Sequence, residues 1–404
     1  MTAHEKSTLS MVAVGDLIQT RPLTPYEGTA AAFDGLVARL RDADATVGNL
    51  EVLIHDYEGY PAATSGGTYM RAPPAVLDDI LELGFDLFSA ATNHTFDFSH
   101  GGIEATLGHL DRRDVAYAGL GETLFEARRP AYRETAAGRV GLVSAATSYT
   151  AGAEAGERTP ATSGRPGLNP IGVSRVHRLP PAELETLKRL SETVGIERIK
   201  MDWFDRGLLY DHDWGDETFF HFGDMKFEET DGEPGIGYQA DPSAVGAFRS
   251  AIEDAAYNAD WSIATIHTHQ GVDGQSGTSE TPAFLVELTH EAIEAGADAV
   301  VCHGPHVLRG IAIYAGSPIF HSLGNFVVQN ETVSRLPPES YKRYGLEEYT
   351  RVADVFSQRL YDEEGQPKGD LADERFWQTV LPVCEFDRDG GIEIALHPCD
   401  LQGA

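Results

Sequence analysis

The chain predicts an α/β fold in which a parallel or mixed sheet is covered by helices on both faces. Two observations predict it. From residue 9 to 146, apolar runs of strand length alternate with segments of helical periodicity, and the alternation returns after 241. A chain of 404 residues is also long enough to bury a full core of this kind. We expect one domain spanning 1–404 rather than two equal halves.

The first part of the chain predicts four strands separated by helices. The helix that begins at Pro73-Pro74 ends before Gly84, since proline suits the first turn of a helix and glycine its C-terminal end. The expected strands are 9–15, 45–50, 86–92 and 139–146, and the expected helices are 29–42, 74–83 and 99–113.

The segment 150–240 departs from this alternation. Gly, Pro and Thr dominate 150–170, a charged helix is expected at 180–200, and aromatic residues then interleave with acidic ones up to Phe222. Because aromatic side chains usually pack, the segment can be read as an insertion with its own small core. The alternative is a lid that supplies substrate contacts over the strand ends.

Regular alternation resumes at Asp241-Pro242, where Asp caps a helix that proline begins and that runs to 258. The segment 331–375 is polar and is expected to be irregular. The remaining expected elements are strands at 261–267 and 298–302, a helix at 280–295, a β-rich stretch at 307–328 with a turn at Gly316-Ser317-Pro318, and strands at 378–386 and 391–397.

The charge of the chain excludes several classes of partner. A formal net charge of −32 repels nucleic-acid phosphates and anionic membranes, so we expect neither as a partner. Three cysteines without paired spacing indicate a reducing compartment. No run near 18 apolar residues occurs, and we expect a cytoplasmic protein. The oligomeric state cannot be predicted.

Five of the predicted strands end in polar residues of kinds that bind metals. Ligands gather outside the carboxyl ends of strands in an open α/β sheet, so these side chains could converge on one pocket. Carboxylates and imidazoles together suit Zn, Mn or Fe. The strand-end residues are Asp16, Glu51, Asn93, His94, His267 and His303.

Two histidine pairs add to this set. His267 and His269 lie two apart on an extended segment, so both side chains point to the same side. His303 and His306 straddle the turn at Gly304-Pro305. Either pair could bind a metal, or one member of each could hydrogen-bond a substrate.

The neighbouring segment offers a proton donor. Asn93 could bind a metal through its carboxamide oxygen, which leaves the His94 imidazole free for proton transfer. Asp97 lies three residues further on and could orient that imidazole.

These motifs resemble the CapA family, which is named for poly-γ-glutamate capsule formation and is itself similar to the calcineurin-like metallophosphatases. The resemblance spans about 9–328 outside the insertion. It implies a four-layer αββα metallophosphatase-like sandwich that holds the acidic, aromatic-rich segment 150–240 as an insertion. The matching stretches are Gly15-Asp16, Gly48-Asn-Leu-Glu51, Asn93-His94 with Asp97 and Gly101-Gly102, Ala118-Gly-Leu-Gly121, the His267 strand, Gly296-Ala-Asp298, His303-Gly-Pro-His306-Val-Leu and Pro318-Ile-Phe-His-Ser-Leu-Gly-Asn-Phe326.

The resemblance also implies roles for the site residues. His94 would be the general acid, helped by Asp97, and Asn325 is expected to orient a loop through backbone hydrogen bonds. His269 would be an extra ligand or a substrate contact. Ile18 stands where related enzymes carry a second ligand, so the site would hold one divalent ion, two or none. The implied metal ligands are Asp16, Glu51, Asn93, His267, His303 and His306.

Three functions follow. The first is a metal-dependent hydrolase that cleaves a phosphoester or an amide or γ-glutamyl bond with activated water. The second is metal-independent acid/base chemistry at Cα, as in a peptide epimerase, with Asp16 and His303 as two bases. The third is a capsule-biosynthesis component without hydrolytic activity. The expected ligand is a small molecule, a peptide or polyglutamate, and Arg165, Arg175 and Arg178 are the loose candidates for binding a polyanion.

Overall fold

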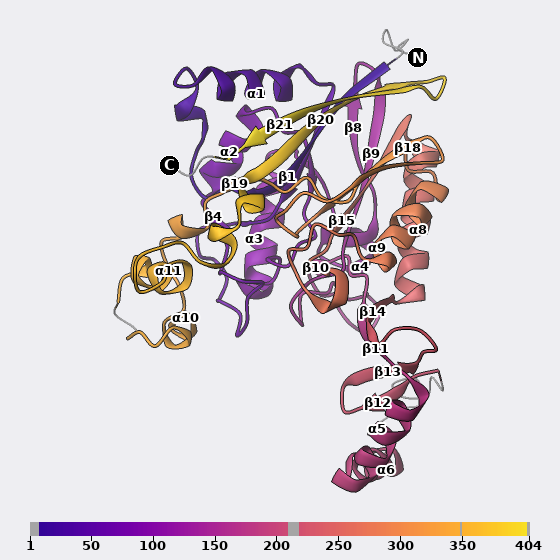
Figure 1. The fold of residues 1–404 in the computed structure, drawn as a ribbon. Helices are drawn as coiled ribbons and strands as arrows, with labels where there is room; N and C mark the ends of the chain where they lie inside the picture. The colour runs from indigo at the N-terminus through magenta and orange to yellow at the C-terminus, as the bar shows by residue number, and fades with distance from the viewer. Residues whose placement is uncertain (1–7, 209–217, 348–349, 402–404) are drawn as a thin grey trace.

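The computed structural model describes residues 8–208, 218–347 and 350–401. The chain folds into a mixed α/β structure built around two large sheets (Figure 1). This confirms the α/β fold class that the alternating pattern predicts.

The first sheet has seven strands in the order β21-β20-β1-β2-β5-β6, with β19 also paired to β1. Strands β2, β5, β6 and β19 run parallel to their neighbours, whereas β20 and β21 are antiparallel. The strands are β1 (Thr8–Ile18), β2 (Ala45–Leu50), β5 (Leu87–Ser89), β6 (Ala116–Ala118), β19 (Asn325–Val328), β20 (Gln378–Asp387) and β21 (Ile392–Asp400).

The second sheet has six strands in the order β17-β18-β16-β15-β9-β8. Its four central strands are parallel and its two edge strands antiparallel. The β17–β18 hairpin turns at Ala315-Gly316, both with positive φ, one residue before the predicted turn. The strands are β8 (Ala131–Thr135), β9 (Gly138–Ala146), β15 (Trp261–His267), β16 (Ala299–His303), β17 (Ile311–Tyr314) and β18 (Ser317–Phe320).

Three apolar clusters set the order of the layers. Leu9 and Val47 of the first sheet share a buried cluster with Val140 and Ile263 of the second, so the two sheets pack face to face. A second cluster joins the first sheet to helices α1 (Ala31–Asp42), α2 (Pro74–Glu82) and α3 (Ser99–Asp111). A third joins the second sheet to α8 (Pro242–Asn258) and α9 (Ala283–Glu294). Burial of one large apolar side chain contributes about 1.5–3 kcal/mol, so these clusters supply the main stabilisation.

The start of α8 confirms the predicted cap. The Asp241 carboxylate accepts a 2.8 Å hydrogen bond from the Ser243 amide, and Pro242 is the first helical residue. The shorter elements are α4 (Leu124–Arg128), the paired strands β3 (Leu53–Ile54) and β4 (Arg71–Ala72), the paired strands β7 (Leu120–Gly121) and β10 (Gly167–Leu168), and 3₁₀ turns at Thr24–Tyr26, Val272–Gly274 and Asn330–Thr332.

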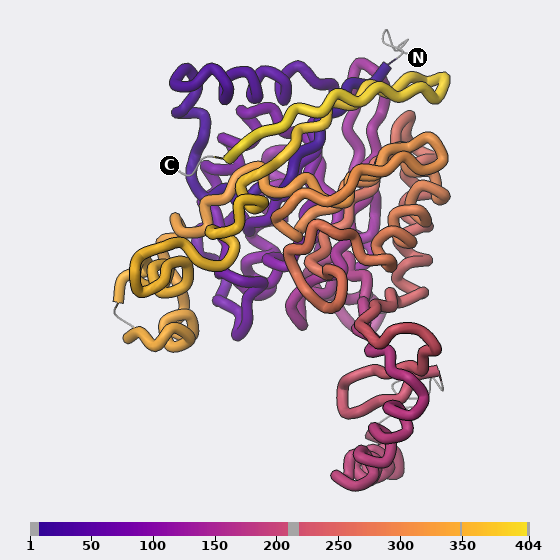
Figure 2. The backbone as a smooth tube through the Cα atoms, viewed as in Figure 1, coloured from indigo at the N-terminus to yellow at the C-terminus, as the bar shows by residue number. Residues whose placement is uncertain are grey.

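The predicted insertion divides into two parts. Residues 150–172 stay on the body, where β10 pairs with β7, while residues 173–208 and 218–240 form an arm that extends away from it (Figure 2). The predicted helix at 180–200 is two helices, because Gly195 adopts φ 85° and ends the first. Residues 209–217 lie outside the described part. The arm contains β11 (Val173–Leu179), α5 (Pro181–Val194), α6 (Ile196–Asp205), β12 (Phe220–Phe222), β13 (Met225–Glu229) and β14 (Gly235–Ala240).

The expectation of an irregular segment at 331–375 is wrong in part. It holds α10 (Pro338–Arg343), α11 (Val352–Leu360) and two 3₁₀ turns, Gly369–Ala372 and Glu374–Trp377. The helices are short and bury few apolar residues, namely Tyr341, Val355 and Phe356, so their periodicity is hard to detect. Among the described helices, none has both the length and the apolarity needed to span a bilayer.

Candidate functional site

The polar strand ends of both sheets meet where the two sheets face each other. Asp16 at the end of β1 is in register with Asn49 in β2 and with Asn325 in β19. In the second sheet, His267 and His303 are paired at the ends of β15 and β16. The carboxyl ends of parallel strands thus bring the predicted residues together.

A first group of possible metal donors combines two carboxylates and one imidazole. Asp16, Glu51 and His306 each offer an atom, and these atoms lie within 4.8 Å of one another. Nδ1 of His306 lies 3.0 Å from Oδ2 of Asp16, and Nε2 of His306 lies 3.8 Å from Oε1 of Glu51. His306 adopts φ 57°, a left-handed conformation that aims its ring at both acids and that is uncommon outside glycine.

A second group shares Glu51 with the first. It combines Glu51 with His267 and His269, again with donor atoms within 4.8 Å of one another. Nε2 of His267 lies 3.9 Å from Oε1 of Glu51 and 3.2 Å from Nε2 of His269. The Asn93 Oδ1 atom lies 3.0 Å from the same His267 nitrogen, so this amide borders the second group.

Glu51 is the carboxylate common to both groups, and it is fully buried. Neither of its oxygens has a hydrogen-bond partner among the described residues. Burial, and then the nearby charge of Asp16, raise the pKa of Glu51 well above its ordinary value. Burying a carboxylate without a partner is costly, and a cation between the two groups would remove that cost. The donor set therefore fits a divalent metal.

Burial and mutual interaction shift the pKa values of the groups around Glu51 in different directions. Burial alone would raise the pKa of Asp16, but its hydrogen bond to His306 and the nearby imidazoles lower it below its usual range. Burial alone would lower the pKa of His306, and the same hydrogen bond to Asp16 instead raises it. Burial lowers the pKa of His269 to about 3 and that of His267 well below its ordinary value. These two imidazoles are thus neutral, as metal binding requires.

His94 and Asp97 form the predicted pair beside these groups. Nδ1 of His94 lies 2.6 Å from Oδ2 of Asp97, and both side chains are buried. Asp97 also accepts hydrogen bonds from the backbone amides of Gly66 (2.9 Å) and Met70 (2.7 Å). The same carboxylate therefore orients the His94 ring and fixes the loop that crosses it, and the Nε2 edge of the ring is left for proton transfer.

His303 has a different environment from the other predicted ligands. Its Nε2 lies 3.1 Å from the backbone carbonyl of Val14, and its Nδ1 is buried without a partner in the described structure. It belongs to neither donor group. Of the two histidines in the His303-Gly-Pro-His306 turn, the geometry therefore favours His306 as a ligand, and the ligand role of His303 stays a prediction.

Two residues near the donors were not predicted. The Asn49 amide donates to Oδ1 of Asp16 (2.9 Å) and lies 3.3 Å from Nδ1 of His267, so it connects the two donor groups. Its position two residues before Glu51 at a strand end was the available signal. The Phe376 ring packs against His306 with ring centroids 6.0 Å apart. It lies in the final 3₁₀ turn, just past the segment expected to be irregular.

Asn325 has the role expected for it. Its amide nitrogen donates to the backbone carbonyls of Phe376 (3.0 Å) and His306 (3.3 Å). Its Oδ1 also lies 2.9 Å from Nδ1 of His306. Asn325 thus ties the end of β19 to the histidine turn and to the wall formed by Phe376.

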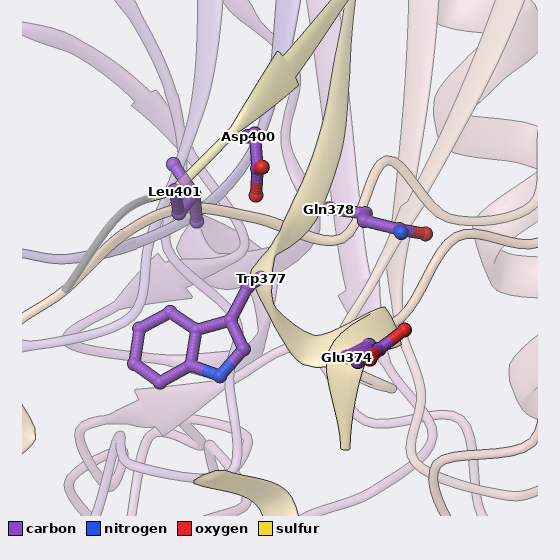
Figure 3. A pocket seen from close by; sticks show the side chains of 5 residues that line it. All are labelled: Glu374, Trp377, Gln378, Asp400 and Leu401. Atoms are coloured by element: carbon purple, nitrogen blue, oxygen red, sulfur yellow. The ribbon is translucent and has the colours of Figure 1, made fainter. Parts of the chain in front are cut away.

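The larger cavity does not coincide with the donor groups. A space of about 330 Å³ opens at the start of β20, where the Trp377 ring and the Glu374 and Asp400 carboxylates surround it (Figure 3). A space of about 10 Å³, room for one water molecule, lies beneath His94. The donor residues line neither cavity, so the chemistry is placed by the donor geometry rather than by cavity size.

Comparison with known proteins agrees with the motifs. The family model for the bacterial capsule synthesis protein PGA_cap matches residues 10–330. The chain belongs to this family. The match begins in β1 and ends just after β19, so it includes every residue of both donor groups. The resemblance that the motifs indicate is thereby confirmed.

Four curated relatives put this PGA_cap family member in context. It is 32% identical to proteins y4sH and y4uA of Sinorhizobium fredii over 403 residues, which cover 97% of this chain and 82% of each relative. It is 24% identical to the capsule biosynthesis protein CapA of Bacillus anthracis, over 90% of this chain and 70% of that one. It is 22% identical to the PGA biosynthesis protein CapA of Bacillus subtilis, over 80% and 64%.

Proposed function

We propose that this PGA_cap family member is a metal-dependent hydrolase that cleaves a phosphoester or an amide or γ-glutamyl bond with activated water. The observation that carries the proposal is Glu51, a fully buried carboxylate with no hydrogen-bond partner among the described residues, placed between two groups of metal donors. A carboxylate shared by two donor groups is the arrangement that suits two neighbouring ions, and either group alone would suit one.

Two groups of donors would bind a divalent ion of the Mn, Zn or Fe type. Asp16 and His306 would bind an ion on one side of Glu51. His267, His269 and the Asn93 oxygen would bind an ion on the other side. When bound, such an ion lowers the pKa of water and polarises the scissile group. Asn49 would keep Asp16 and His267 in place, because its amide contacts both.

His94 would supply the proton that the leaving group needs. Its Nδ1 is held by Asp97 at 2.6 Å, which fixes the ring and makes Nε2 the atom that donates. The loop fixed by Gly66 and Met70 on the same carboxylate would limit the access of water to that proton.

The layer order supports the hydrolase reading. The layers are stacked in space in the order helix, sheet, sheet, helix. Helices α1 to α3 form the first layer, and helices α8 and α9 form the last. An αββα metallophosphatase-like sandwich would have its layers in the same order. The names of the two Bacillus relatives direct the search for a substrate toward capsule polymer, so γ-glutamyl peptides and polyglutamate stand beside phosphoesters in the proposal.

The metal-independent alternative has less support. It needs Asp16 and His303 to face a substrate carbon as two bases. Asp16 instead hydrogen-bonds His306, and Nε2 of His303 contacts the carbonyl of Val14. A capsule-biosynthesis component without hydrolytic activity remains the alternative that the experiment below separates from the hydrolase.

The test compares Glu51→Gln with Glu104→Gln, which removes a carboxylate from the exposed face of α3. Each protein is loaded with Mn²⁺, Zn²⁺ or Fe²⁺ and desalted, its metal content is measured by plasma mass spectrometry, and it is then assayed on phosphoesters and γ-glutamyl peptides. We expect Glu51→Gln to lose both metal and activity and Glu104→Gln to keep both. Retention of metal by Glu51→Gln would refute the site, and metal binding without hydrolysis of any substrate would favour the non-hydrolytic component.

A further inference from the structure

The arm carries an unusual share of the exposed apolar surface. Sixteen large hydrophobic side chains are exposed in the described structure, and eight of them lie between 190 and 225. Helix α6 contributes four and has no buried residue. A surface helix normally buries one face, and a contiguous exposed apolar patch marks an interface. The eight are Leu190, Val194, Ile199, Met201, Trp203, Phe204, Leu208 and Met225.

Two charges of α6 are placed against its own dipole, whereas Glu197 in the first turn is placed with it. Arg198 stands in the first turn, where positive charge is unfavourable, and Asp205 ends the helix, where negative charge is unfavourable. Within the described residues, neither Arg198 nor Asp205 has an ion-pair partner within 4.0 Å. The two residues are seven apart and so lie on the same face, with Met201 between them.

We propose that two copies of this chain associate through α6, with the two α6 helices antiparallel about a two-fold axis. In that arrangement Arg198 of each copy faces Asp205 of the other, and Met201 lies near the axis with Phe204 one turn further along the helix. The two helix dipoles oppose each other, and both unfavourable end charges gain a partner. The face is self-complementary in charge as well as apolar, which a second copy satisfies without any other molecule.

Association through the ends of the arms also limits the electrostatic repulsion between two acidic bodies. Residues 181–206 hold five basic and six acidic residues, a net charge of −1, which leaves −31 for the rest of the chain. Helix α5 has 14 residues and is about 21 Å long, more than twice the roughly 8 Å Debye length at physiological salt. Since α5 and α6 lie at the far end of the arm (Figure 1), a tip-to-tip contact keeps the bodies apart. An anionic membrane would attract neither the tip nor the body.

Sedimentation velocity of the full chain at about 0.15 M NaCl tests the proposal, over a loading range of about 1–100 μM. We expect a reversible dimer of the 43.8 kDa chain. Arg198→Glu and Asp205→Arg should each weaken self-association at least about tenfold, the loss of one charge-pair contribution repeated twice by symmetry. The control is Arg158→Glu, the same charge change at an exposed loop residue on the body.

Charge exchange makes the test specific. Arg198→Glu mixed with Asp205→Arg should form a heterodimer, and the double variant R198E/D205R should regain a homodimer, because both combinations restore opposite charges across the axis. A monomeric wild type, single variants that dimerise as well as the wild type, or no recovery in the mixture and the double variant would each overturn the proposal. A monomer that sediments with phosphatidylcholine vesicles would overturn it too and would assign the patch to a lipid surface.

Discussion

Nδ1 of His306 lies 3.0 Å from Oδ2 of Asp16, although the two residues are 290 positions apart in the chain. The contact joins the end of β1 in the first sheet to the turn that follows β16 in the second. It also reverses the effect of burial on both groups, so the Asp16 carboxylate and the His306 imidazole stabilise each other's charge. The candidate site is thus held by a hydrogen bond that spans the two sheets.

Replacement of the two turn histidines should have unequal effects. His306→Ala removes a donor from the first group and the imidazole that hydrogen-bonds Asp16, so we expect metal affinity and kcat/KM to fall about 100-fold or more. His303→Ala removes only a contact with a backbone carbonyl and should reduce both far less. Metal titration and steady-state kinetics of the two variants check this order. A larger loss of metal from His303→Ala would move the ligand role to that residue.

The loss of activity in variants of His94 and Asp97 should depend on the leaving group of the substrate. If His94 donates the proton, His94→Gln lowers kcat about 10²–10⁴-fold for a substrate with a poor leaving group and much less for a nitrophenyl ester. Asp97→Asn should show the same dependence on the leaving group, with added loss of stability because the Gly66 and Met70 amides lose charged acceptors. Kinetics on a series of esters and thermal melts give both readouts. Equal losses across the series would exclude His94 as the acid.

Asp86 predicts a specific dependence of stability on pH. Burial raises the pKa of Asp86 from 3.8 to about 6, against the opposing hydrogen bond from the Thr46 amide at 2.9 Å and the attraction of Arg133. Because the folded state holds this proton more tightly, its stabilising effect is complete below pH 3.8 and is lost as pH rises through about 6. Above that pH the charged carboxylate costs the fold roughly 2–3 kcal/mol.

Asp86→Asn keeps the acceptor for the Thr46 amide but cannot ionise. We therefore expect it to be more stable than the wild type at about pH 8 and to keep only about half of that advantage at about pH 5, because the unfolded chain ionises Asp86 above pH 3.8. Urea unfolding at the two pH values measures the difference. An advantage that stays constant between them would show that Asp86 is not the group responsible.

Gly15 should not tolerate even a methyl group. A Cβ at this position would lie 2.0 Å from the carbonyl oxygen of Gly324, which accepts a 3.0 Å hydrogen bond from the Asp16 amide. Gly15→Ala must then separate β1 from the segment that leads into β19, and we expect a loss above about 4 kcal/mol. Gly246→Ala is the matched control, since no atom lies within 4 Å of its Cβ and it sits inside α8. It should stabilise by up to about 1 kcal/mol, and similar effects of the two changes would contradict the crowding argument.

The sequence predicted the elements that carry strong periodicity. Strands 45–50 and 261–267 are found with the predicted bounds, because buried parallel strands read as continuous apolar runs with abrupt ends. The pattern predicts one helix over 180–200 where the structure has two, since a glycine inside an apolar pattern does not by itself reveal a left-handed turn. The helices between 331 and 375 were missed because they are short and polar.

The membership of the site could be predicted better than its geometry. Strand-end positions alone indicate Asp16, Glu51 and His267, since β-topology places such residues together. The choice between His303 and His306 depends on the φ of the turn between them, which no pattern in the sequence sets. The contact of Asn49 with both donor groups depends on the register of β1 against β2, and that too becomes visible only in the folded chain.

The position of β1 between β2 and β20 has a consequence for synthesis of the protein. The strand pairs on one side with residues 45–50, and on the other side its residues 8–12 pair with residues 383–387, so this part of the edge stays open until almost the whole chain has left the ribosome. At about 5–20 residues per second this interval lasts roughly 20–70 s. During that time a long apolar strand edge is exposed to other nascent chains, and we expect the yield of folded protein to depend on chaperones that cover it.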